Sequence, residues 1–409
     1  MIKISPSDLS CQTAIISLGT ELRNLKRGDE RISGLELQAR ACAKAIRAAG
    51  LKPKDIGALF TGRPPNENIN PQWSMVLVDA LKIAPKISTS VSIHGAGHLA
   101  TIKYATLAVA TGLVDYALCV SGAAAPFWMR SASAVPFLEC DSQFEAPFRP
   151  LTPALYAQWA SRYVYEFGAT PEQAARIAVE HRKWGVLHPD AAMKDKGLIT
   201  IDDVVNSTMI ASPMRIMDCA PWYPGGMGVA TIVARSEVAS RHNKPIYIHG
   251  FGECSTHESI TERVSLRDVP PAIGDNPNVT TTGAAVAAKD AYDMSGWTPK
   301  DINLLQTQAP FTYMIMMALE DLGFCPKGGA GAFIEAGGID FNGGLPTNTS
   351  GGMLSFGQPN NTNPLLPEAI EQLRGEARGR QVSGASKALV HFHGGPFAAH
   401  AVALLSNTA

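Results

Sequence analysis

The sequence is short of cysteine, of net charge and of long apolar runs. Its seven cysteines are scattered and never spaced as Cys-x-x-Cys, which indicates reduced thiols in a cytoplasmic protein rather than a disulfide framework or a zinc motif. The formal net charge is −1 and no basic run occurs, which argues against nucleic-acid binding. No stretch of about 20 apolar residues exists, and the amino terminus lacks the apolar core of a signal peptide. We therefore expect neither a membrane span nor a resident metal.

The length and an internal repeat indicate two similar halves. A chain of 409 residues with 45% hydrophobic residues is long enough for two domains or two fused halves. The stretch "GLKPKDIGALFTG" from Gly50 recurs as "GWTPKDINLLQTQ" from Gly296, and each copy follows an Ala-rich helical pattern. Strands that alternate with helices predict mostly parallel sheets covered by helices. The expected organisation is an α/β half over 1–243, with an insertion over about 123–212, and a second half over 244–409.

Two local patterns are specific enough to predict structure. In the insertion, "TPEQAARIAVEHRKWGVL" predicts an amphipathic helix with Thr170 as its N-cap and Pro171 at its first position. In the first half, "SIHGAGHLATIKYATLAVATG" from Ser92 predicts a strand that meets a turn of small residues, 95–97, followed by an apolar helix. Free backbone N–H groups at such a helix start can hold an oxyanion. The turn itself contains no nucleophile.

Five longer motifs resemble one known family. They are "FGATPEQAARIAVEHR", "DCAPWYPGGMGVATIVARS", "LEDLGFCPKGGAGAFIEAGGI", "LPTNTSGGMLSFGQP" and "QLRGEARGRQV". Together they resemble the thiolase superfamily, nearest to the sterol-carrier-protein type thiolases and the bacterial lipid-transfer-protein or acetyl-CoA acetyltransferase-like branch. The resemblance implies a thiolase fold: two duplicated βαβαβαββ halves, a five-layer α-β-α-β-α arrangement and a loop domain inserted in the first half. It also implies acyl transfer or carbon–carbon bond chemistry on CoA thioesters.

The chain departs from the family at all four catalytic positions. Counting along the resemblance places Gly95 where the family has its nucleophilic cysteine. The oxyanion motif becomes Gln308-Ala309-Pro310-Phe311, and Gly-His-Pro becomes Gly357-Gln358-Pro359. The last motif becomes Phe392-His393-Gly394, with His391 beside it. Ordinary thiolase chemistry through an acyl-cysteine is therefore not expected.

The remaining polar residues supply the candidate catalytic groups. His391 and His393 flank a phenylalanine in a predicted strand and so share one face, where they would act as general acid or base. The alternatives are a metal pair and a polar pair at a subunit interface. His94 is a further candidate base beside the glycine turn. Gln308 and Gln358 would donate hydrogen bonds to a thioester oxygen, unless they reflect drift after loss of activity.

A second set of residues is expected to contact the substrate or the CoA moiety. These contacts come from the glycine turns, from His98, from the basic end of the inserted helix and from one tryptophan: Gly95, Gly97, His98, Gly357, Gly394, Arg182, Lys183 and Trp222. Guanidinium and ammonium groups suit the phosphates of CoA. A solvated helix face for the basic pair and core packing for the tryptophan are the alternatives.

Three functions follow from the resemblance. The first is retro-aldol cleavage of an acyl-CoA thioester without a covalent nucleophile; relatives that do this carry tyrosines at the positions of Gln308 and the Gln358 region, so another base is required here. The second is a non-catalytic thiolase-fold subunit, or a CoA-ester or lipid-binding partner in a hetero-oligomer. The third is residual acetyltransferase activity. The resemblance also implies a homodimer through the first half and a small zinc-ribbon/OB-fold partner chain, with CoA thioester as ligand and no bound cofactor.

Overall fold

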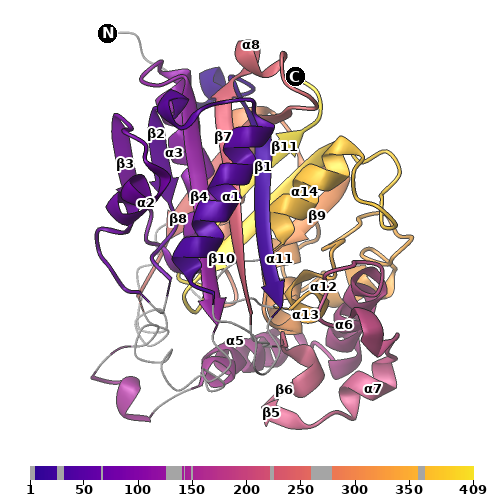
Figure 1. Ribbon diagram of the computed structural model, residues 1–409. Coiled ribbons are helices and arrows are strands. Elements are labelled where there is room, and N and C mark those ends of the chain that lie inside the picture. Colours follow the sequence, from indigo (N-terminus) through magenta and orange to yellow (C-terminus); the bar gives the residue numbers. More distant parts are fainter. Residues whose placement is uncertain are drawn as a thin grey trace.

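One large mixed sheet runs through the molecule (Figure 1). The computed structural model describes residues 5–24, 32–65, 68–125, 141, 143–148, 151–221, 225–258, 279–357 and 364–409. Within these ranges the sheet has nine strands, in the order β3 (Ile87–Ser90), β2 (Ala58–Thr61), β4 (Tyr116–Ala125), β7 (Gly225–Arg235), β1 (Thr13–Asn24), β8 (Ile246–Ser255), β11 (Ala399–Ser406), β10 (Lys387–Gly394) and β9 (Leu304–Thr307). A separate small sheet pairs β5 (Met209–Ala211) with β6 (Met214–Arg215).

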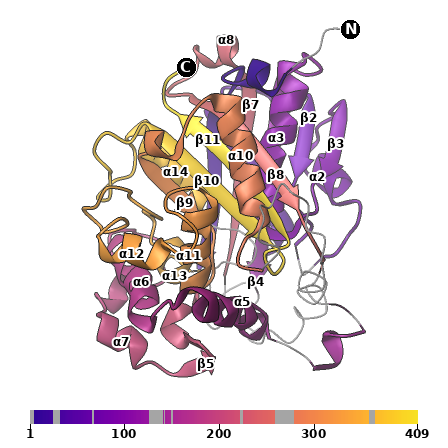
Figure 2. The ribbon, with the colours of Figure 1, turned by 180° about the vertical axis from the view of Figure 1, so that it is seen from behind.

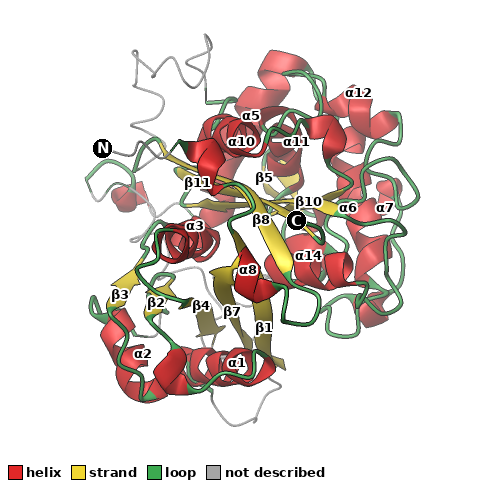
Figure 3. Ribbon diagram, turned by 90° about the horizontal axis from the view of Figure 1, so that it is seen from above, coloured by secondary structure: helices red, strands yellow, loops and turns green. Residues whose placement is uncertain are grey.

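Helices form three layers around the two arms of this sheet (Figure 3). On the outside of one arm lie α1 (Gly34–Ala48) and α2 (Trp73–Leu81), whose apolar faces share a core with β1, β2, β4 and β7. Between the arms lie α3 (Gly97–Ala110) and α14 (Leu365–Arg374), which share a core with strands of both arms. On the far side lie α10 (Gly283–Ser295) and α11 (Thr312–Asp321), and Figure 2 shows α10 across β8 and β11. The five-layer thiolase fold expected from the sequence is confirmed.

The two arms meet where β1 pairs with β8, over Thr13–Ile15 and Ile246–Ile248. Strands that precede α8 (Ser236–Ala239) build one arm and strands that follow it build the other. The division into 1–243 and 244–409 stays a prediction. No helix in the described ranges is both long and apolar enough to cross a membrane.

A group of helices lies below the sheet in the view of Figure 1. They are α5 (Thr152–Phe167), α6 (Pro171–Gly185), α7 (Ile201–Val205), α12 (Ala330–Glu335) and α13 (Gly352–Ser355). The predicted inserted helix is α6, and the Thr170 hydroxyl accepts the Gln173 N–H at 3.3 Å as its N-cap. Capping by Thr170 and the proline that follows it explain why the helix begins there.

The alternation of side chains along β10 determines the direction in which His391 and His393 point. Ala388, Val390 and Phe392 lie in the core between the two arms, whereas Leu389 lies in the core on the opposite face. Alternation along a strand therefore places His391 and His393 on the Leu389 face. This confirms that the two histidines share a face.

A buried ionic contact fixes α5 against α11. The Tyr163 hydroxyl donates to the Glu320 carboxylate, which also lies 3.3 Å from the Lys327 ammonium. Burial and the neighbouring Glu320 raise the pKa of Tyr163, so its hydroxyl keeps its proton. Tyr156 lies two helical turns earlier on the same face of α5.

Candidate active site

The glycine turn predicted from the sequence is a short 3-10 segment, His94–Ala96, that leads directly into α3. His94 has a positive φ of 49°, an unusual backbone for a residue with a side chain. A Cβ at Gly97 would lie 2.4 Å from the Val91 carbonyl oxygen, so the chain can enter α3 this closely only with glycine. The turn therefore presents the amino-terminal end of a 14-residue helix.

The position predicted for the lost nucleophile has no room for a side chain. A Cβ built on Gly95 would lie 2.5 Å from the His393 carbonyl oxygen and 2.8 Å from Nε2 of Gln308. Real Cβ atoms do not approach backbone oxygen so closely, so a cysteine here would displace β10 or the Gln308 amide. The space beside Gly95, the position predicted for the nucleophile, is thus filled by a backbone carbonyl and an amide side chain.

The hairpin turn between β10 and β11 packs directly on the glycine turn. A Cβ at Gly394 would lie 2.3 Å from the Ile93 carbonyl oxygen and 2.7 Å from Cβ of His94. Gln308 follows β9, and its N–H donates to the His391 carbonyl at 2.8 Å. The structure therefore brings together five of the predicted site residues from three separate segments: His94, Gly95, Gln308, His393 and Gly394.

His391 is enclosed in a chain of hydrogen bonds that defines its protonation. His400 Nε2 donates to the Phe397 carbonyl at 3.1 Å, so His400 Nδ1 accepts, at 3.0 Å, from His391 Nε2. His391 Nδ1 then accepts from the Thr307 hydroxyl at 2.8 Å. Burial, with His393 adding to it, lowers the pKa of His391 to about 3, and burial lowers that of His400 well below its usual range. Both nitrogens of His391 are engaged, so the structure places this residue behind the site.

His393 has a free nitrogen and a neighbour that the sequence did not reveal. The Tyr156 hydroxyl, from α5, donates to the Gly395 carbonyl at 2.5 Å and lies 3.5 Å from His393 Nδ1. His393 Nε2 is buried and has no hydrogen-bond partner among the described residues. Burial lowers the pKa of His393 to about 4, so the imidazole is neutral at pH 7. A proton on Nδ1, facing the tyrosine oxygen, leaves the lone pair on Nε2.

His94 is half-buried at the edge of the same cluster. Nη1 of Arg63, from the loop after β2, lies 3.5 Å from His94 Nδ1. Burial and, second, the positive charge of Arg63 lower the pKa of His94 to about 4. His94 is therefore a neutral imidazole beside the amino terminus of α3.

Several predicted site residues lie elsewhere. The buried His98 ring faces Phe392, on the side of β10 opposite to His391, with ring centroids 6.0 Å apart. Arg182 is buried and donates to the Ser355 hydroxyl and the Gly197 carbonyl, and Lys183 pairs with Glu180 at 2.6 Å. The structure thus gives both basic groups partners within the protein.

Two predicted residues, Trp222 and Gln358, lie outside the described residues. Gly357, which precedes Gln358, has a positive φ of 97° that favours glycine.

Three of the described cysteine thiols are poor candidates for a replacement nucleophile. Burial raises the pKa of Cys119, Cys219 and Cys325 to about 12, so each keeps its proton at neutral pH. Across the described ranges no group of three His, Cys, Asp or Glu side chains could hold a metal ion.

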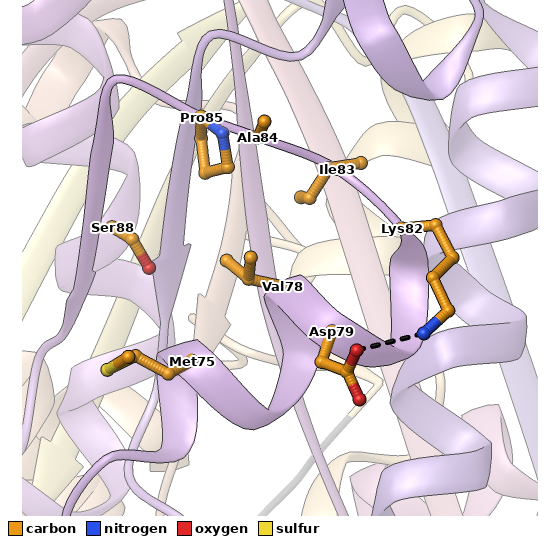
Figure 4. Close-up of a pocket in the computed structure, with 8 residues that line it drawn as sticks. All are labelled: Met75, Val78, Asp79, Lys82, Ile83, Ala84, Pro85 and Ser88. Carbon is orange, nitrogen blue, oxygen red and sulfur yellow. Dashed lines mark hydrogen bonds and ion pairs between the residues drawn. The ribbon is translucent and has the colours of Figure 1, made fainter.

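A hollow of about 610 Å³ lies apart from these residues, between α2 and β3 (Figure 4). Its wall is formed by Met75, Val78, Asp79, Lys82, Ile83, Ala84, Pro85 and Ser88. Asp79 and Lys82 pair with each other at 2.8 Å, and no histidine or cysteine lines the space. The hollow therefore lacks the groups that acyl-CoA chemistry needs.

The buried neutral histidines predict acid-sensitive stability. His98 has a pKa lowered to about 4 by burial, from an ordinary value of 6.5, and neither ring nitrogen has a partner among the described residues. The unfolded chain binds a proton that the folded chain excludes, so this contribution is full above pH 6.5 and is lost as the pH falls toward 4. At pH 5 the stability lost in this way amounts to about 2 kcal/mol.

We expect His98→Leu to gain stability relative to the parent as the pH falls. The free energy of unfolding of the variant minus that of the parent should be about 2 kcal/mol larger at pH 5 than at pH 7.5. Urea unfolding at the two pH values measures this difference. His242→Leu, which alters a partly exposed ring, is the control and should change the pH dependence far less. An equal effect of both variants would contradict a neutral, desolvated His98.

Comparisons with known protein sequences agree with this architecture. Residues 270–407 match the family described as "Thiolase C-terminal domain-like". The chain is 30% identical to an acetyl-CoA acetyltransferase of Methanothermobacter thermautotrophicus over 372 residues, which cover 88% of this chain and 91% of that protein. It is 29% identical to the 17-hydroxy-3-oxo-4-pregnene-20-carboxyl-CoA lyase of Mycobacterium tuberculosis, over 90% of this chain and 92% of that one. It is also 29% identical to a steroid side-chain-cleaving aldolase of Thermomonospora curvata, over 84% and 86% of the two chains.

Solved structures give the same picture. A structure described as "Ltp2-ChsH2(DUF35) aldolase" superposes with a TM-score of 0.79 at 27% identity, covering 97% of this chain and 98% of that one. Human mitochondrial 3-ketoacyl-CoA thiolase superposes with a TM-score of 0.68 at 14% identity, covering 98% and 100% of the two chains, and shows a common fold. Both superpositions cover nearly all of this chain and therefore include both arms of the sheet.

Proposed function

The chain belongs to the thiolase superfamily, and we propose that it cleaves a carbon–carbon bond of a 3-hydroxyacyl-CoA thioester by a retro-aldol reaction. The observation that carries the proposal is the filled space at Gly95, where a nucleophilic side chain would clash with the His393 carbonyl and the Gln308 amide. A covalent acyl-enzyme needs a nucleophile there, whereas a retro-aldol step needs a base and an oxyanion site. The two similar proteins whose names state lyase or aldolase activity support this choice.

His393 is the proposed base. Its Nε2 lone pair takes the proton of the substrate hydroxyl, the carbonyl forms at that carbon, and the electrons of the broken bond move into the thioester as an enolate. The low pKa of His393 keeps the imidazole unprotonated at neutral pH, so it is ready to accept. The proton held on His393 then returns to the α carbon of the enolate. The products are a ketone or aldehyde and a shortened acyl-CoA, and atoms and charge balance.

The enolate oxygen needs donors that are in place before the bond breaks. The N–H groups at the start of α3 and the Gln308 amide, which lies against Gly95, are the proposed donors. His391, held between Thr307 and His400, positions the strand that carries His393. Gln358 remains a proposed donor, and Gly97, Gly357, Gly394 and Trp222 remain proposed substrate contacts.

We also propose that the chain works with other subunits. The name of the aldolase structure joins two components, which supports a hetero-oligomer. A small partner chain of zinc-ribbon/OB-fold type stays a proposal from the family resemblance. A homodimer through the amino-terminal half and a cytoplasmic location stay proposals from the sequence. A non-catalytic subunit of such an assembly is the alternative function. Acetyl transfer is less well supported because Cys119, Cys219 and Cys325 are thiols rather than thiolates near neutral pH.

Calorimetric titration with CoA, acetyl-CoA and a 3-hydroxyacyl-CoA tests the proposal. We expect the hydroxyacyl ester to bind more tightly than the other two and to release a carbonyl product slowly. Tight binding of all three without product, in the presence of the partner chain, would instead support the non-catalytic alternative. The absence of CoA-ester binding would contradict the cleavage activity and leave a subunit without a CoA site.

A further inference from the structure

The imidazole of His94 lies between the Arg63 guanidinium and the hairpin turn that joins β10 to β11, with one nitrogen facing each. Nη1 of Arg63 lies 3.5 Å from Nδ1. On the other edge of the ring, Cδ2 and Nε2 lie 3.6 and 3.9 Å from where a Cβ of Gly395 would stand. Nε2 makes no hydrogen bond to any of the described residues. The two ring nitrogens therefore meet different surroundings.

A guanidinium can only donate, so the nitrogen that faces Arg63 must present its lone pair. The proton of the neutral ring then sits on Nε2, on the side of the hairpin turn. We propose that Arg63 fixes His94 as the neutral Nε2–H tautomer, which makes His94 a hydrogen-bond donor to the substrate oxyanion rather than a base. The catalytic part of this assignment rests on the proposed retro-aldol function; the tautomer does not.

The electrostatics around the ring point the same way. His94 is the first residue of the segment that leads into α3, and the positive end of a helix disfavours a cation there. Arg63 adds a full positive charge. The titratable groups on the elements packed against this segment are His98, Lys103 and Tyr104 on α3, Lys387, His391 and His393 on β10, and His400 on β11. Burial lowers the pKa of each of the four histidines, so all four are neutral at pH 7. Nothing on these elements supplies a negative charge that would favour an imidazolium.

The backbone keeps the ring in this place. His94 has a positive φ of 49°, and a Cβ at position 394 would lie 2.7 Å from its own Cβ, so the ring lies this close to β10 only because residue 394 is glycine. A neutral imidazole that donates through Nε2 matches an enolate oxygen, because it stabilises the negative charge without giving up its proton early. With this tautomer the two histidines of the site have different roles: His94 donates a hydrogen bond, and His393 accepts a proton.

Nuclear magnetic resonance of protein labelled with ¹⁵N-histidine tests the tautomer without any substrate. His94→Gln identifies the His94 signals among the ten histidines of the chain. We expect a pyridine-like Nδ1 and a pyrrole-like Nε2, unchanged from pH 8 to pH 5. Arg63→Gln should raise the pKa of His94 by about one unit, and Arg63→Lys, which keeps the charge, by less. A pyrrole-like Nδ1, or a pKa that ignores both substitutions, would overturn the assignment.

Substitution of His94 separates donor from base. Glutamine places an N–H close to the position of Nε2, whereas asparagine places it close to Nδ1. His94→Gln should keep kcat within about tenfold of the parent, whereas His94→Asn and His94→Ala should lower it 100-fold to 1,000-fold. Equal losses in all three would overturn the donor role. If the parent protein cleaves no hydroxyacyl-CoA, the proposed function fails, and the resonance experiment still decides the tautomer.

Discussion

Gly95→Ala should lower kcat/KM for hydroxyacyl-CoA cleavage at least 100-fold, since small displacements of a catalytic group carry losses of about this size. The added methyl would meet the His393 carbonyl at 2.5 Å and the Gln308 amide at 2.8 Å. Neither the backbone of β10 nor the amide can yield without moving a proposed catalytic group. We also expect a loss of about 1–3 kcal/mol in the free energy of unfolding, as for other overpacked sites.

Gly344→Ala is the matched control, because no atom lies within 4 Å of the Cβ that it would add. Steady-state kinetics and urea unfolding of the two variants separate a local clash from a general effect of glycine replacement. Gly95→Cys should be as impaired as Gly95→Ala and should not acquire acetyl transfer. A Gly95→Cys protein with parental stability and a covalent acyl intermediate would contradict the conclusion that this turn has no room for a nucleophilic side chain.

His393→Gln should lower kcat by 100-fold to 10,000-fold with little change in KM, the range typical of a lost general base. Glutamine retains a polar side chain but offers no imidazole lone pair at the position of Nε2. Rapid-mixing kinetics under saturating substrate measure the chemical step directly. Cleavage at the parental rate would remove His393 from the mechanism.

Tyr156 acts on the same step through His393, and its substitution gives a graded effect. Tyr156→Phe removes the hydroxyl that bonds Gly395 and lies beside His393 Nδ1, but it keeps the ring that packs on Phe311 with centroids 5.0 Å apart. We expect kcat to fall about tenfold, which corresponds to about 1.4 kcal/mol, while KM stays the same. Tyr165→Phe, on the exposed side of α5, is the control and should leave both constants unchanged.

Local patterns in the sequence predicted the parts of the fold that depend on local rules. The cap at Thr170, the shared face of His391 and His393, and the glycine turn at the start of α3 follow from capping, strand alternation and small-residue spacing. Shared motifs predicted the five-layer arrangement. These features need no knowledge of which distant segments meet.

The rest of the site depends on contacts between residues that are far apart in the sequence. Tyr156 meets His393 across 237 residues of sequence, and no local pattern marks it among the aromatic residues of α5. His98 is the second residue of α3, four residues after His94, yet its ring lies in the core against Phe392. The enclosure of His391 depends on His400 and Thr307, which lie on neighbouring strands. The sequence predicted that His391 and His393 share one face of a strand, but it could not tell which histidine keeps a nitrogen without a partner among the described residues.

Cleavage without a covalent intermediate is the central claim, and a single-turnover reaction followed by intact-protein mass measurement tests it most directly. The enzyme, in excess over a 3-hydroxyacyl-CoA, is quenched in acid at intervals, with and without prior alkylation of its thiols. We predict stoichiometric release of a carbonyl compound and a shortened acyl-CoA, an unchanged protein mass at every time, and no effect of alkylation. A transient acyl adduct on the protein, or loss of turnover on alkylation, would contradict the account.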